Sequence, residues 1–162
     1  MQLNFTELRA GSEWNPVNDG VMGGLSRSRL LPDSDGTVRF EGEVSLENNG
    51  GFASVRHRLR QPPPENSHLL RLQVLGDGKV YKLSLRIDDS FDSISYQADF
   101  YPASHQWMEI DFTPDQFVPT FRGRVVNAPA MTSFGQVHQL GLMIANRQSG
   151  AFCLKLRSIS FL

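Results

Sequence analysis

The chain has 162 residues, of which 40% are hydrophobic and 20% are charged. This composition is typical of a globular protein and excludes a disordered chain. The formal net charge of −1 argues against a nucleic-acid binder, which needs a clustered basic face. Because Cys153 is the single cysteine, no intrachain disulfide can form, and the sequence predicts a protein of a reducing compartment.

No targeting signal is recognisable in the first residues of the sequence. Residues 1–8 have no basic start, no long apolar run and no Arg/Ser-rich amphipathic pattern, so neither a secretory nor a mitochondrial signal is predicted. The sequence also lacks an apolar run of about 18 residues, the length that would span a bilayer. We therefore expect a cytoplasmic protein with no direct membrane insertion, folded as a single domain over residues 1–162.

Two glycine-rich loops dominate the first third of the chain. Residues 14–26 contain three glycines within five positions beside Asn18 and Asp19, which favours a shaped turn over a helix or strand. A hairpin follows, with strands at residues 28–31 and 38–46 and a turn at residues 33–36. Gly42 falls on the apolar side of its strand and predicts a bulge or close packing. The second loop, with Asn48, Asn49 and paired glycines, leads into a strand at residues 52–59.

The rest of the chain alternates with the period of a strand. Residues 61–66 are rich in proline and predict a surface connection, and residues 113–117 predict a capped helical turn. A change of phase near residues 157–158 predicts a β-bulge. The segment Gly76-Asp77-Gly78 predicts a hairpin between the strands on either side of it. The further strands are expected at residues 69–75, 79–87, 93–101, 106–112, 140–145 and 151–162.

About ten short strands with little helix predict an all-β fold. The length fits a jelly-roll β-sandwich of two antiparallel sheets. The inward phase of residues 106–112 leaves Trp107, Glu109 and Asp111 on the opposite face. With Tyr101, Trp107 offers a platform for a sugar ring, although aromatic residues also fill sandwich cores.

No catalytic constellation stands out in the sequence. Glu109 and Asp111 share a strand face, as a pair of glycosidase carboxylates could, but a solvated face explains them better. The aspartates of residues 33–35 and 88–92 leave a structural calcium ion open, and turn chemistry also accounts for them. The four histidines occur singly, without metal-ligand spacing. We therefore expect no enzyme and no cofactor.

Several motifs in order along the chain resemble those of the complex I intermediate-associated protein 30 (CIA30) family. The first is NDGVMGGLS at residues 18–26, preceded by Trp14. The second is FEGEVSLENNGGFASVR at residues 40–56. Shorter matches are GDGKVY at residues 76–81, FRG at 121–123, LGLMI at 140–144 and GAF at 150–152.

The resemblance implies a galactose-binding-domain-like jelly roll, similar to some carbohydrate-binding modules. It also implies a non-enzymatic role, because mitochondrial members are assembly factors of respiratory complex I and plant relatives serve photosynthetic biogenesis. The expected partners are therefore protein subunits of a larger complex, with a glycan bound on a concave sheet face as the alternative. The sequence shows neither a transit segment nor the extra domain of some plant forms, and these departures favour the expectation of a free-standing bacterial relative.

The two loops and the adjacent strand face are the candidate contact surface. A purely structural role explains the same loop residues equally well. In that case the glycines only permit tight loops, and the polar side chains only satisfy buried backbone groups. We predict that the loops pack together, with Asn18 or Asp19 bonded to backbone in or beside the second loop. The candidate binding residues are Trp14, Asn18, Asp19, Met22, Asn48, Asn49 and Arg56 for the loops, and Trp107 for a glycan.

Overall fold

The protein is a sandwich of two antiparallel sheets, seen in a computed structural model that describes residues 1–5 and 13–162, without the side chains of Asn4, Val21 and Met22. Sheet A has the order β3-β4-β13-β6-β9, and β1 pairs with β13. Its strands are β1 (Gln2–Asn4), β3 (Arg27–Pro32), β4 (Val38–Val44), β6 (Leu70–Leu75), β9 (Trp107–Phe112) and β13 (Gly150–Phe161).

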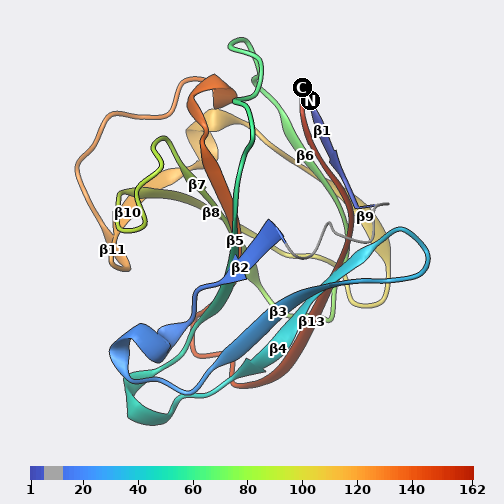
Figure 1. Cartoon of the computed structure of the whole chain (residues 1–162), viewed down its shortest axis with the longest axis vertical. Coiled ribbons are helices and arrows are strands. Elements are labelled where there is room, and N and C mark those ends of the chain that lie inside the picture. Colours follow the sequence, from blue (N-terminus) through green and yellow to red (C-terminus); the bar gives the residue numbers. More distant parts are fainter. Residues whose placement is uncertain (6–12) are drawn as a thin grey trace.

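Sheet B has the order β11-β10-β8-β7-β12-β5-β2. It faces sheet A across the core, and it lies on the left in Figure 1. Its strands are β2 (Trp14–Pro16), β5 (Ala53–Arg58), β7 (Tyr81–Arg86), β8 (Ser95–Phe100), β10 (Val118–Phe121), β11 (Arg124–Val125) and β12 (Gln139–Ile144). The predicted all-β jelly-roll sandwich is therefore confirmed.

Local chemistry predicted several features correctly. Strands β3 and β4 form the expected hairpin, in which Ser28 lies opposite Gly42. A Cβ on Gly42 would lie 2.0 Å from the Arg27 carbonyl oxygen, so close packing explains this glycine. The register between β13 and β6 shifts between Leu156 and Ser158, which is the predicted bulge. The 3-10 helix η4 (Pro114–Gln116) has the predicted cap, a capping box that includes Thr113.

The hairpin predicted around residues 76–78 is wrong, because its two strands belong to different sheets. β6 lies in sheet A and β7 in sheet B. The Asp77 carboxylate accepts hydrogen bonds from the Tyr81 hydroxyl at 3.0 Å and from the Cys153 amide at 2.8 Å. Asp77 thus ties the start of β7 to β13 at the point where the chain crosses between sheets. Glycines around an aspartate signal a turn, but they do not say which sheet the chain enters next.

Thirteen strands occur in residues 1–5 and 13–162, more than the ten or so predicted. The additional ones are short: β1 and β2 have three residues each, β10 has four and β11 has two. Segments of this length carry too little alternation for a pattern to predict them.

The inner faces of the two sheets enclose one aromatic core. Tyr81 packs edge-on against Phe40 with ring centroids 6.1 Å apart, and it stacks with Phe100 at 6.0 Å. A second group continues the core toward the other end of the sandwich. Its contacting rings are Phe112, Phe117, Phe134 and Phe161. The helices of the described residues are short, and none has the length and apolar character of a membrane-crossing segment.

Candidate functional site

The two glycine-rich loops meet at one end of the sandwich through the buried carboxylate of Asp19. Asp19 begins the 3-10 helix η2 (Asp19–Met22) in the first loop, residues 17–26. Its Oδ2 atom accepts hydrogen bonds from the Gly51 amide at 2.8 Å and from the Phe52 amide at 3.4 Å, both in the second loop, residues 45–52. Ser26 completes the network, because its amide donates to Oδ1 at 2.9 Å and its hydroxyl donates to Oδ2 at 2.6 Å.

Asn18 adds a second link between the first loop and strand β5. Its Oδ1 atom accepts a hydrogen bond from the Ser54 amide at 3.0 Å. The hydroxyl of Ser28 donates to the same oxygen at 2.6 Å. The loops therefore pack together, with Asn18 and Asp19 bonded to backbone in or beside the second loop, as the sequence predicts.

The carboxylate of Asp19 is ionised inside this network. Burial by itself raises the pKa of Asp19, but the hydrogen bonds from Ser26, Gly51 and Phe52 outweigh burial and hold the pKa below its ordinary value. Two glycines leave space for the Asp19 carboxylate, because a side chain at either position would overlap it. A Cβ on Gly24 would lie 2.3 Å from Asp19 Cγ, and one on Gly50 would lie 2.6 Å from Asp19 Oδ2.

These contacts separate the candidate residues that build the loops from those that reach the surface. Asp19 has 0% of its surface exposed and Trp14 has 5%. The Trp14 ring stacks on His57 with centroids 5.1 Å apart, so it belongs to the core and not to a contact surface. Asn18 is half-buried, and its Oδ1 atom accepts two hydrogen bonds. The side chain of Met22 lies outside the described residues, so its proposed contact stays a prediction.

Asn48 and Asn49 are the loop candidates that face solvent. They lie in the 3-10 helix η3 (Glu47–Asn49), and both adopt left-handed backbone, with φ of 56° and 59°. Asparagine tolerates this conformation better than most residues. Both side chains are exposed.

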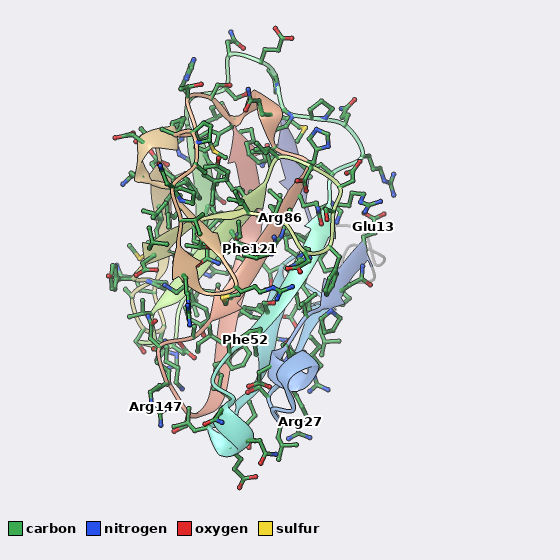
Figure 2. The ribbon with its side chains drawn as sticks, turned by 90° about the vertical axis from the view of Figure 1, so that its left-hand side faces the viewer. Glu13, Arg27, Phe52, Arg86, Phe121 and Arg147 are labelled. Carbon is green, nitrogen blue, oxygen red and sulfur yellow. The ribbon has the colours of Figure 1, made fainter. Side chains whose placement is uncertain are left out.

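A third connection, which no local sequence pattern signals, belongs to the same end. Residues 145–149 join β12 to β13, while residues 45–52 join β4 to β5. Since β12 pairs with β5 and β13 pairs with β4, the two connections run between neighbouring strands. Asn146 and Arg147 also have positive φ, 61° and 55°, and both are exposed. Figure 2 shows Arg147 at the same end as Phe52.

We call residues 17–26, 45–52 and 145–149 the paired-loop end. Its exposed side chains include Leu25, which has 54% of its surface accessible, together with the two asparagines of η3, Asn146 and Arg147. Among the described side chains, this surface thus combines amide groups, the Arg147 guanidinium, the Glu47 carboxylate and the aliphatic Leu25 on a base fixed by Asp19. Such a surface can form directional hydrogen bonds with little loss of conformational entropy on binding.

Arg56 does not belong to the paired-loop end. It lies on the outer face of sheet B, where its Nη1 donates to the Phe91 carbonyl at 2.8 Å and its guanidinium lies 4.9 Å from the Phe91 ring centroid. The next arginines along the chain also have partners. Arg58, at the end of β5, donates to the Asp89 carbonyl at 2.8 Å, and Arg60, just after the strand, pairs with Glu13.

Trp107 lies on the outer face of sheet A, away from the paired-loop end. The guanidinium of Arg157 covers its ring, 4.2 Å from the centroid. The two carboxylates beside it on β9 are also engaged. Glu109 accepts from Gln73 at 3.2 Å, and Asp111 accepts from Arg71 at 2.8 and 3.0 Å. The bond from Arg71 holds the pKa of Asp111 below its ordinary value, which is opposite to what a general acid needs.

The aspartates considered as calcium ligands lie beside basic groups. Asp33 contacts Arg39 at 2.9 Å, and Asp92 contacts Arg122 at 2.7 Å. Within residues 1–5 and 13–162, no three His, Cys, Asp or Glu side chains gather closely enough to hold a metal ion. Calcium binding stays a prediction.

A hollow of about 640 Å³ lies on the outer face of sheet A near its β3 edge. Ion pairs Arg27–Glu43, at 3.7 Å, and Arg29–Glu41, at 3.0 Å, line one side of it. Cys153 lines it too, and burial raises the pKa of this thiol. The thiol therefore stays protonated at neutral pH, which does not suit a nucleophile.

The sandwich belongs to the fold class of several carbohydrate-binding modules. It is similar to the family 11 module of the Clostridium thermocellum cellulase Lic26A-Cel5E, with a TM-score of 0.69, 11% identity and coverage of 100% of this chain and 95% of that one. A structure of a Clostridium thermocellum family 11 module in complex with a β-1,3-1,4-mixed-linked tetrasaccharide matches with a TM-score of 0.65 and 13% identity over 96% and 94% of the two chains. Identities this low show the fold alone.

Residues 3–156 match the family described as complex I intermediate-associated protein 30 (CIA30), and the chain belongs to this family. A relative in Schizosaccharomyces pombe, the uncharacterized protein C9E9.15, is 30% identical over 169 residues. That alignment covers 91% of this chain and 76% of the yeast protein. The resemblance inferred from the loop motifs is therefore confirmed.

Proposed function

We propose that this protein is a non-catalytic binding protein that assists assembly of a respiratory complex of the NADH:ubiquinone oxidoreductase type, or of a related redox complex. The observation that carries the proposal is the family match over residues 3–156. The name of that family refers to intermediates of complex I. The partners would be protein subunits of the complex.

The paired-loop end is the surface that we assign to this role. Its base is rigid, because Asp19 and Asn18 fix the first loop to the second loop and to β5. Its exposed amides, on Asn48 and Asn49, are held in left-handed backbone and point away from the core. A fixed array of polar groups suits recognition of a protein surface, because few side chains need to be ordered on binding.

The test is capture of partners from the source organism with the tagged chain. The wild-type protein should return subunits of a respiratory or photosynthetic redox complex. Asn48→Gly combined with Asn49→Gly should abolish capture, since glycine keeps the left-handed backbone and removes both amides. Asn66→Gly is the matched control, because this exposed asparagine lies in the connection from β5 to β6 at the opposite end (Figure 1).

Native gel electrophoresis of deletion and complemented strains of the source organism would report assembly of the complex directly. Deletion of the protein should leave a partly assembled complex, and the double glycine variant should not restore it. If the wild-type chain captures no subunit of a redox complex, the proposal is wrong. If capture survives the double variant, the role would belong to another surface of the protein.

Carbohydrate binding at Trp107 is the second candidate, favoured by the likeness of the fold to carbohydrate-binding modules. A sugar would have to displace Arg157, whose guanidinium lies over the indole. A glycan array with a Trp107→Ala control tests this candidate. Binding that the substitution leaves unchanged, or no binding at all, would contradict it.

A further inference from the structure

On the outer face of sheet B, two arginines lie on either side of strand β12. Arg56 of β5 lies opposite Gly141 of β12, and Gly141 lies opposite Ser84 of β7. Arg86 follows two residues after Ser84 and points to the same face. Because Gly141 has no side chain, no group from β12 stands between the two flanking strands in this row. Figure 2 looks onto this face and labels Arg86.

Both guanidinium groups converge on one turn, residues 87–94. Arg56 donates to the carbonyl of Phe91, and Arg86 donates to the carbonyl of Ser93. From β12, the Gln139 carboxamide donates to the carbonyls of Asp88 and Ser90 at 2.8 and 2.9 Å. The turn is thus clamped to the sheet by side chains from three strands.

The two arginines differ from their neighbours in lacking a carboxylate partner. Arg122 contacts Asp92 at 2.7 Å, and Arg58 approaches Asp89 at 3.6 Å. In the described part of the chain, Arg56 and Arg86 have no carboxylate oxygen within 4.0 Å.

Both side chains are only half-exposed. Burial, and after it the like charge of Arg86, lower the pKa of Arg56 to about 10, against the opposing attraction of Asp92. Burial also lowers the pKa of Arg86, against the attraction of Asp88 and Asp92. Both groups stay charged at neutral pH, so the face holds two partly desolvated like charges.

Most of their hydrogen-bonding capacity remains free for a ligand. A guanidinium has five N–H groups, and each of the two arginines donates through Nη1 to one carbonyl. The buried side-chain atoms that lack a partner in the described residues include no nitrogen of Arg56 or Arg86, so the remaining groups reach solvent. Apolar surface lies on the same face: Phe91, which contacts the Arg56 guanidinium, is 62% exposed, and Val118, two strands away from Arg86 in sheet B, is 44% exposed.

We propose that this face binds an acidic segment of a partner protein, whose carboxylates pair with Arg56 and Arg86 while its apolar side chains contact Phe91 and Val118. This site rests on the proposed assembly role in one respect, namely that its ligand is a protein. The guanidinium fork matches a carboxylate with two parallel hydrogen bonds. The chain already uses this chemistry here, since Asp92 pairs with Arg122. Nucleic acid is a poor fit, because the net charge is −1.

The test is titration of the full chain with a labelled oligoglutamate peptide, followed by fluorescence anisotropy. Arg56→Gln and Arg86→Gln should each weaken binding about tenfold, the loss expected for one charge-assisted contact. Arg29→Gln is the charge-matched control on the outer face of sheet A, and it should bind like the wild type. Affinity should also fall as salt is raised.

Amide shifts of the wild-type protein provide a readout that needs no variant. On addition of the peptide, the resonances of Ser84, Gln97 and Gly141 should move, while those of the paired-loop end should not. An equal loss in Arg29→Gln, equal binding of an oligoglutamine peptide, or tighter binding of inorganic phosphate would overturn the proposal. If oligoglutamate binds as expected while partner capture fails, the assembly role is wrong and this site stands.

Discussion

Replacement of Asp19 by asparagine tests whether one buried carboxylate holds the paired-loop end together. Asparagine keeps the shape but offers one acceptor oxygen and one donor amide. If the amide oxygen takes the place of Oδ2, the new NH2 group faces the Ser26 amide, which then loses its acceptor. The bonds from Gly51 and the Ser26 hydroxyl remain but lose their charge assistance. One orphaned buried donor and weaker remaining bonds together cost about 3 kcal/mol.

Urea unfolding at pH 7, followed by far-UV circular dichroism, measures this loss, and the melting temperature should fall by about 6–12 °C. The pKa of Asp19 is lower in the folded state, so its stabilising effect is present above its unfolded pKa and lost as the pH falls through its folded pKa. Below that pH, Asp19→Asn and wild type should converge. Glu65→Gln, at an exposed carboxylate in the connection from β5 to β6, should leave the midpoint nearly unchanged. A loss below about 0.5 kcal/mol for Asp19→Asn, within the range of ordinary surface substitutions, would refute the reasoning.

Two further substitutions test the packing of the loops and of the sheet A surface. Gly24→Ala should destabilise the protein by about 3 kcal/mol in urea unfolding, because its Cβ would overlap the Asp19 carboxylate, whereas Gly20→Ala, with nothing within 4 Å of its Cβ, should be near neutral. Stability equal to wild type in Gly24→Ala would show that the carboxylate can move aside. Arg157→Ala should uncover Trp107, so iodide quenching of tryptophan fluorescence should rise while the buried Trp14 contributes none of the increase. Unchanged quenching would mean that the guanidinium does not cover the indole in solution.

Sequence patterns predicted the structural features that depend on residues close together in the chain. The β3–β4 hairpin, the cap of η4 and the bulge in β13 each follow from a few adjacent positions. The contact between Asp19 and the second loop was also predicted, since a glycine-rich loop with polar residues beside it needs a partner for its backbone groups. The candidate residues themselves were harder to sort, because burial of Trp14 and exposure of Asn48 depend on the assembled sandwich.

The features that the sequence could not predict depend on the pairing of strands that lie far apart in the chain. Residues 76–78 carry strong turn signals, yet the strands they join enter different sheets. Asn146 and Arg147 join the paired-loop end because β12 pairs with β5 and β13 pairs with β4, far apart in sequence. The position of Arg56 beside Arg86 requires the order β7-β12-β5 in the same way. Each of these placements is a long-range contact that no local pattern encodes.

The place of β13 has a consequence for how the protein forms during synthesis. This strand follows the other strands in the chain, yet it lies between β4 and β6 in sheet A and also pairs with β1. Sheet A therefore cannot close until residues 150–161 have left the ribosome, while the strands of sheet B are complete by residue 144. In the interval, the apolar inner face of sheet B and the unpaired edges of β4 and β6 are open to water. Nascent chains at this stage should be the species most prone to aggregation and most in need of a holding chaperone.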